Sequence, residues 1–103
     1  MKALITGATG LVGSNLAARL SREGTHTIRV LVRTESDLSF LKTLKNIEYV
    51  YGDIRDKGSL AGALSGIEVV FHCAAFVSDW ASRDEMYAIN VTGLQNIMDA
   101  ALA

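Results

Sequence analysis

The chain has 103 residues, of which 50% are hydrophobic and 20% are charged, and its formal net charge at pH 7 is -1. This composition is typical of a globular protein, and the balanced charge offers no basic surface for nucleic acid. A single cysteine, Cys73, excludes an internal disulfide, and no apolar run has the length of a membrane span. We therefore expect one soluble, cytoplasmic domain with no nucleic-acid or membrane partner.

Apolar runs of strand length alternate along the chain with segments of helical periodicity, as in parallel sheets flanked by helices. We predict strands at residues 2–6, 27–33, 47–51 and 68–73. Between the first two, Val12, Leu16 and Leu20 recur at helical spacing, and Gly24 follows them as a stop signal. The pattern predicts a first helix that crosses over the sheet.

Three more helices are predicted further along the chain. One covers residues 37–44, and another covers residues 57–64 with Asp56 as its N-cap and Gly66 near its end. The last begins near residues 82–84, carries an apolar stripe and reaches Ala103 without a stop signal. We therefore expect residues 1–103 to be one domain of a longer protein, with the stripe facing a missing strand, a missing helix or a second copy in a homodimer.

Three glycines lie between the first predicted strand and the first predicted helix. A helix that starts directly after a strand points free N–H groups and a positive dipole end at the space above the sheet, where a phosphate can bind. There, Gly7 would make a tight turn, Gly10 would let a pyrophosphate approach the main chain, and Gly13 would let the helix pack closely on the sheet. The N–H groups of Leu11 and Val12 are the predicted anion donors.

The glycine spacing is G-x-x-G-x-x-G, which differs from the G-x-G-x-x-G of the standard dinucleotide fingerprint. Its place between a strand and a helix, within a βαβ unit of about 30 residues, is the context that this motif requires. A merely flexible turn is the alternative. A P-loop is excluded because no Gly-Lys-Ser/Thr follows the glycines.

The segment TGATGLVG at residues 6–13 resembles the cofactor loop of the extended short-chain dehydrogenase/reductase superfamily. That superfamily includes nucleotide-sugar epimerases and dehydratases, dihydroflavonol reductases and hydroxysteroid dehydrogenases. Three other segments are similar to its motifs in order and spacing: GDI at 52–54, VFHCAA at 70–75 and NVTGLQN at 90–96, in which Leu94 stands where the family usually has Thr. The resemblance covers the whole chain.

The fold class that follows is α/β: a three-layer, Rossmann-like, doubly wound parallel sheet with strand order 3-2-1-4, truncated after its fourth strand and last helix. The resemblance implies that the cofactor is a nicotinamide dinucleotide. In such folds an acidic side chain about 20 residues after the glycines binds the adenosine ribose, whereas an Arg accommodates a 2′-phosphate. Arg33 occupies this place and favours NADP over NAD, although Glu35 could still reach a ribose hydroxyl.

Other candidate residues follow the later strands. Asp56 is better placed than Asp53 to cap a helix, which leaves Asp53 free to accept from the adenine amino group, as the resemblance implies. Small residues at the end of the fourth strand suit a passing cofactor, and Asn90 is expected to make an internal hydrogen bond near the active-site loop. The predicted cofactor-binding residues are Gly7, Thr9, Gly10, Leu11, Val12, Gly13, Arg33, Asp53, Ile54, Ala74, Ala75 and Asn90.

Two neighbouring side chains, His72 and Cys73, are predicted to be core residues, because adjacent strand residues point to opposite faces and cannot jointly bind a metal. No metal site is expected. The residues Phe76, Val77, Ser78 and Trp80 are weaker candidates for substrate contact.

The family's chemistry, as the resemblance implies, is hydride transfer with a Ser and a Tyr-x-x-x-Lys pair acting on the alcohol or carbonyl. None of Tyr49, Tyr51 and Tyr87 is followed four residues later by Lys. We therefore predict no catalytic residue here and an inactive cofactor-binding part of an oxidoreductase, epimerase or dehydratase that acts on a sugar nucleotide or another small alcohol or carbonyl compound. A non-catalytic NADP sensor is the alternative, and a methyltransferase is a poorer one.

Overall fold

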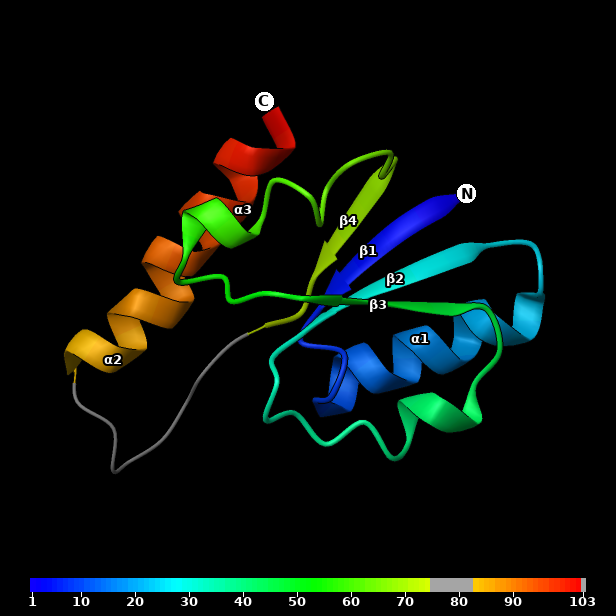
Figure 1. Ribbon diagram of the computed structural model, residues 1–103. Helices are drawn as coiled ribbons and strands as arrows, with labels where there is room; N and C mark the ends of the chain where they lie inside the picture. The colour runs from blue at the N-terminus through cyan, green and yellow to red at the C-terminus, as the bar shows by residue number, and fades with distance from the viewer. Residues whose placement is uncertain (75–82, 103) are drawn as a thin grey trace.

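The computed structural model describes residues 1–74 and 83–102 (Figure 1). The predicted residues Ala75 and 76–80 therefore lie outside the described residues. The strands are β1 (Lys2–Thr6), β2 (Thr27–Val32), β3 (Ile47–Tyr51) and β4 (Val69–His72), and the α-helices are α1 (Leu11–Glu23), α2 (Arg83–Tyr87) and α3 (Gly93–Leu102). The 3-10 helices η1 (Leu41–Thr43) and η2 (Lys57–Ser59) and the π-helix η3 (Ala88–Thr92) complete the order.

The four strands form one parallel sheet in the order β3-β2-β1-β4, as predicted. Thr6, the last residue of β1, pairs with Leu31 on one side and with His72 on the other. All four carboxyl ends therefore meet at one edge of the sheet. Since β2 and β4 flank β1 on opposite sides, the chain reverses its winding direction at β1, which is where open α/β sheets bind ligands.

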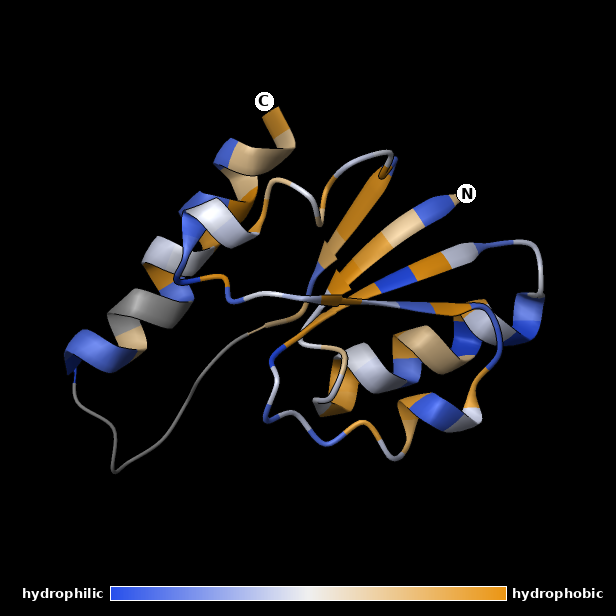
Figure 2. Cartoon of the chain, in the orientation of Figure 1, coloured by the Kyte–Doolittle hydropathy of each residue, from blue (hydrophilic) through white to orange (hydrophobic). Residues whose placement is uncertain are grey.

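The core consists of two clusters on opposite faces of the sheet, which gives three layers (Figures 1 and 2). Side chains alternate along a strand, so in β1 Ile5 packs in the cluster between the sheet and α1, whereas Leu4 packs in the cluster on the side of α3. Both are fully buried, and burial of such a side chain contributes about 1.5–3 kcal/mol. The central strands β1 and β2 are buried along almost their whole length because both of their faces are covered, whereas the residues of β3 and β4 are half-buried or exposed.

Arg29 in β2 is a charged exception within this core, with 6% of its surface exposed. Its guanidinium donates to the carbonyl oxygens of Ala63 and Ser65, both at 2.8 Å, and to the carboxylate of Glu48 at 3.0 Å. Its charge and its donors are thus satisfied. Through these hydrogen bonds, Arg29 links the segment after η2 to the sheet.

Helix α1 ends as predicted, because Gly24 adopts φ 73° and its N–H bonds to the carbonyl oxygen of Ser21. Leu20 of this helix is buried in the core, but Val12, which was expected on the same apolar stripe, is 68% exposed. Val12 lies in the first helical turn, at the edge of the molecule where the strands end. Val12 is exposed because the helix starts at this edge, although its spacing fits the apolar stripe.

Two predicted helices are wrong. In place of residues 37–44 the chain forms only η1, because the carboxylate of Asp37 accepts from both the backbone N–H and the hydroxyl of Ser39, a local bond that competes with a helix. In place of residues 57–64 it forms only η2, although Asp56 caps it by accepting from the Gly58 N–H. Glycines at 58 and 62 weaken a longer helix there.

The last predicted helix is present from Arg83 to Leu102, but a π-helix, η3, interrupts it. Asn90 lies within this π-helical segment and is half-buried. Ile97 of α3 is buried against the sheet, whereas Leu94 and Met98 are exposed, so only part of the expected apolar stripe is covered. No helix in the described parts of the chain is long and apolar enough to cross a membrane.

Candidate functional site

The turn between β1 and α1 brings main chain against main chain. Gly7 has φ 69°, a left-handed conformation that favours glycine, and its carbonyl oxygen accepts from the Gly10 N–H at 3.0 Å. A Cβ on Gly7 would lie 2.6 Å from the backbone N of Ala74 and from the backbone C of Cys73, at the end of β4. Gly7 therefore makes the tight turn, as predicted, and also permits close contact between β1 and β4.

The predicted role of Gly13 requires a correction. A Cβ there would lie 2.2 Å from the carbonyl oxygen of Gly7, so the close approach is between α1 and the glycine turn itself, not between α1 and the sheet. A Cβ on Gly10, by contrast, would have only one neighbour, the Gly7 oxygen, at 3.4 Å. The space beside Gly10 is open.

The N-terminus of α1 has the features of an anion site. Its N-cap is Gly10, no side chain in the described part of the chain caps it, and its first turn carries no acidic residue. Helix N-termini in this state present free N–H groups and a positive dipole end. The arrangement can bind a phosphate without any basic side chain.

A cavity of about 240 Å³ opens beside this turn, at the carboxyl ends of the strands. Its residues come from the ends of β1 and β2 and from the segments that directly follow each of the four strands. Apolar walls and a few polar groups are typical of a small-molecule site. The cavity is lined by Thr6, Gly7, Thr9, Gly10, Leu31, Val32, Arg33, Ser36, Gly52, Asp53, Ile54, Arg55, Cys73 and Ala74.

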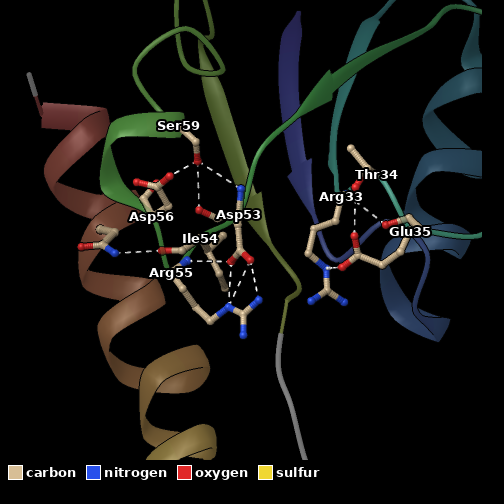
Figure 3. A network of polar contacts seen from close by, with 10 residues as sticks. Arg33, Thr34, Glu35, Asp53, Ile54, Arg55, Asp56 and Ser59 are labelled. Atoms are coloured by element: carbon tan, nitrogen blue, oxygen red, sulfur yellow. Dashed lines mark hydrogen bonds and ion pairs between the residues drawn. The ribbon is translucent and has the colours of Figure 1, made fainter.

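Two ion pairs stand at the side of the cavity formed by the ends of β2 and β3 (Figure 3). The Arg55 guanidinium and the carboxylate of Asp53 approach to 2.6 Å, and the backbone N–H of Arg55 donates to the same carboxylate. The side-chain hydrogen bonds from Arg55 hold the pKa of Asp53 below its usual value. Asp53 is therefore charged at neutral pH. We expected its carboxylate to be free to accept from the adenine, but Arg55 binds it.

The second pair joins Arg33 to Glu35 at 3.3 Å, and both side chains are largely exposed (Figure 3). A hydrogen bond from its own backbone N–H, and then one from the hydroxyl of Thr34, lower the pKa of Glu35. Glu35 is thus ionised at neutral pH. A phosphate that binds Arg33 would have to compete with this carboxylate.

Thr6 forms part of the cavity wall and is 1% exposed. Its hydroxyl accepts from the backbone N–H of Ala74 at 3.2 Å and lies 2.7 Å from Nδ1 of His72. Burial lowers the pKa of His72, which favours the neutral ring, so Nδ1 can accept the Thr6 proton. His72 and Cys73 were predicted to be core residues, but both are half-buried. The His72 ring makes a hydrogen bond with the Thr6 hydroxyl, and Cys73 lines the cavity.

The structure brings most of the predicted residues together, but not all. Leu11, Val12 and Gly13 lie at the start of α1 without lining the cavity, and Asn90 lies in η3. Sequence reasoning missed several lining residues, although the rule that ligands bind at the carboxyl ends of parallel strands could have identified those that end or directly follow a strand. The missed residues are Thr6, Leu31, Val32, Ser36, Gly52, Arg55 and Cys73. No three His, Cys, Asp or Glu side chains within residues 1–74 and 83–102 form a group that could hold a metal ion.

Residues 4–103 match the 3-beta hydroxysteroid dehydrogenase/isomerase family. The chain belongs to this family. Sterol demethylase protein B of Methylococcus capsulatus is 41% identical to it over 102 residues, which are 98% of this chain and 30% of that protein. The 3-beta hydroxysteroid dehydrogenase/isomerase family is part of the extended short-chain dehydrogenase/reductase superfamily, so the resemblance noted in the sequence is confirmed.

Solved structures agree with this assignment. The crystal structure of gox2253 is 44% identical, has a TM-score of 0.84, and matches 97% of this chain and 30% of that one. A short-chain dehydrogenase/reductase superfamily protein from Agrobacterium tumefaciens, crystallised with bound NAD, is 34% identical with a TM-score of 0.80, over 98% of this chain and 29% of that one. The Rossmann-like fold is therefore shown, and the chain spans about 30% of the length of these relatives.

Proposed function

We propose that residues 1–103 form the dinucleotide-binding part of an NAD(P)-dependent oxidoreductase. The observation that carries this proposal is the uncapped N-terminus of α1, which opens through the glycine turn onto a cavity at the point where the sheet reverses its winding. Anion donors and an open glycine at that place fit a pyrophosphate. The relative from Agrobacterium tumefaciens, which was crystallised with NAD, supports the same ligand class.

The strand order supports a proposal for how the two halves of the dinucleotide are placed. With the pyrophosphate at α1, an adenosine whose ribose lies at the end of β2 extends toward β3, the next strand in that direction. The nicotinamide half then lies toward β4, over Ala74. In this arrangement Gly7, Thr9 and Gly10 face the phosphates, while Asp53 and Ile54 lie beside the base.

We propose NADP as the preferred cofactor, because Arg33 lines the cavity at the end of β2. Its guanidinium can leave Glu35 for a 2′-phosphate, which carries more charge and offers bidentate geometry. With NAD, Glu35 could instead accept from the ribose hydroxyls. The preference therefore depends on which member of the Arg33–Glu35 pair the cofactor engages.

Calorimetric titration of the chain with NAD and NADP tests this proposal. We expect both to bind and NADP to bind more tightly. Arg33→Gln should lower the affinity for NADP about tenfold and leave that for NAD unchanged, because only NADP carries the phosphate. The matched control is Arg22→Gln, which removes the same charge from the last turn of α1. Equal or tighter binding of NAD by the unaltered chain would remove the role of Arg33, and binding of neither would refute the proposed function.

The reaction proposed for the whole protein is hydride transfer between the nicotinamide, which supplies or receives the hydride, and a small alcohol or carbonyl substrate. A sugar nucleotide was the first expectation, but the family and the relative named as a sterol demethylase protein favour an alicyclic alcohol of the hydroxysteroid kind. The chain contains no Tyr-x-x-x-Lys and spans about 30% of the length of its relatives, which supports the proposal that residues outside 1–103 supply the acid–base chemistry. A cytoplasmic location and a homodimer through the exposed side of α3 are also proposed.

A further inference from the structure

The turn that follows β3 is held from outside the cavity by helix α3. The side-chain amide of Asn96 donates to the carbonyl oxygen of Ile54 at 2.8 Å, and Asn96 is half-buried. Asn96 does not itself line the cavity, whereas Asp53, Ile54 and Arg55 all do. The bond therefore reaches the site only through the main chain of the turn.

Close packing places α3 where this bond can form. Gly93, the first residue of α3, faces Ile54 so closely that a Cβ on it would lie 2.7 Å from Cδ1 of Ile54. Ile54 is 8% exposed and packs in the same cluster as Ile97. One turn after Gly93, the amide of Asn96 meets the Ile54 carbonyl.

The Ile54 carbonyl belongs to the residue between Asp53 and Arg55, so its position affects the orientation of that ion pair (Figure 3). Three N–H groups of Arg55 approach the Asp53 carboxylate: its backbone N–H, Nε–H and one terminal N–H. Because Nε–H is shared between the two oxygens, each oxygen already accepts twice, and a further donor can bind where it displaces this shared contact from one oxygen. At this place in the proposed site, the donor that the carboxylate would meet is the exocyclic amino group of the adenine.

We propose that Asn96 is a positioning residue of the dinucleotide site, which fixes the turn at Asp53–Arg55 and so aims the carboxylate of Asp53 at the adenine amino group. This inference rests on the proposed function. Helix α3, which contributes no residue to the cavity lining, would then take part in recognising the base.

The test compares NAD with nicotinamide hypoxanthine dinucleotide, in which an oxygen replaces the adenine amino group. Asn96→Leu removes the amide, and Asn96→Asp keeps the volume while removing the N–H donors. The matched control is Gln95→Leu, because Gln95 is the neighbouring amide on α3 and is exposed. Affinities are measured by calorimetry on the chain, after thermal unfolding has shown that each variant is folded.

We expect both Asn96 variants to bind NAD about three- to tenfold more weakly, with little change for the hypoxanthine analogue, while the control changes neither affinity. The ratio of the affinity for NAD to the affinity for the analogue then falls toward one. An equal loss for both ligands would show a merely structural role, and unchanged affinities would also overturn the inference. Retention of NAD affinity in Asn96→Asp would show that packing, and not the donated hydrogen bond, is responsible.

If the unaltered chain binds neither dinucleotide, the proposed function is wrong, and amide hydrogen exchange then decides the positioning role without a ligand. The Asp56 N–H donates to the Asp53 carbonyl at 2.9 Å within this turn. Faster exchange of that amide in Asn96→Leu, but not in Gln95→Leu, supports the role of Asn96. Unchanged exchange overturns it.

Discussion

Replacement of Gly13 by alanine tests whether the chain's own backbone requires this glycine. The new Cβ would lie 2.2 Å from the carbonyl oxygen of Gly7, 2.7 Å from its carbonyl carbon and 2.9 Å from Cα of Ala8. All three are backbone atoms of a tight turn, so no side chain can rotate away. To bring the shortest contact to 3.0 Å, α1 or the turn must move by about 0.8 Å.

The expected cost follows from two opposing effects. Overpacking of this kind costs about 1–3 kcal/mol. Alanine inside a helix recovers up to about 1 kcal/mol relative to glycine, because the unfolded chain loses less conformational freedom. We therefore expect Gly13→Ala to lower the free energy of unfolding by about 1–2 kcal/mol, which for a domain of this size lowers Tm by about 5–10 °C.

Gly10→Ala is the matched comparison, in the same turn. Its Cβ would meet only the Gly7 oxygen, at 3.4 Å, and φ of Gly10 is -83°, which alanine tolerates. Thermal unfolding followed by circular dichroism should therefore place its Tm within about 3 °C of the unaltered chain. Calorimetric titration should show about a tenfold loss of NAD affinity, because the methyl group stands where the pyrophosphate would approach.

Two outcomes would contradict these expectations. A Gly13→Ala chain that unfolds at the original temperature would show that the turn relaxes without cost. A Gly10→Ala chain that loses more stability than Gly13→Ala would show that the backbone contacts are assigned to the wrong glycine.

Three further predictions concern activity, a buried charge and pH. The purified chain should transfer no hydride between NAD(P)H and alcohol or carbonyl substrates, and turnover above a contaminant control would contradict the missing Tyr-x-x-x-Lys. Arg29→Leu should cost about 2–4 kcal/mol in urea unfolding, because the carbonyl groups of Ala63 and Ser65 lose their donors; an unchanged midpoint would show that water replaces Arg29. Burial lowers the pKa of His72 in the folded state, so the unfolded chain takes up the proton first and stability should fall as the pH drops below about 6.5. His72→Gln should lack this part of the pH dependence, and an identical pH profile in the variant would assign it to other groups.

The strands could be predicted from the sequence because they are mainly apolar runs, and in β1 and β2 nearly every residue is buried. Their order followed from the Rossmann-like fold class. Predicted and observed strands coincide at Lys2–Thr6 and Ile47–Tyr51, and differ by one residue at the ends of β2 and β4. The helix stop at Gly24 was equally readable, since a left-handed residue favours glycine. These features depend on local chemistry and on a hydrophobic pattern, both of which a sequence displays.

The two failed helices and the ion pairs show what the sequence could not supply. The carboxylate of Asp37 can either begin a helix or bond to Ser39 two residues on, and the two outcomes differ by too little energy to separate from residue types alone. The binding of Asp53 by Arg55 depends on how the turn after β3 folds back on itself. A charged residue two positions away in sequence could equally have pointed into solvent.

The three glycines of the first turn serve different needs, which a motif cannot distinguish. Side chains at Gly7 and Gly13 are excluded by the protein's own backbone, at the end of β4 and at the turn itself. Only Gly10 faces open space, so at this position alone of the three the fold does not require glycine. Because glycine at an unstrained position costs about 0.5–1 kcal/mol of unfolding free energy, a gain elsewhere must offset it, and the approach of a ligand to the bare main chain at Gly10 supplies one.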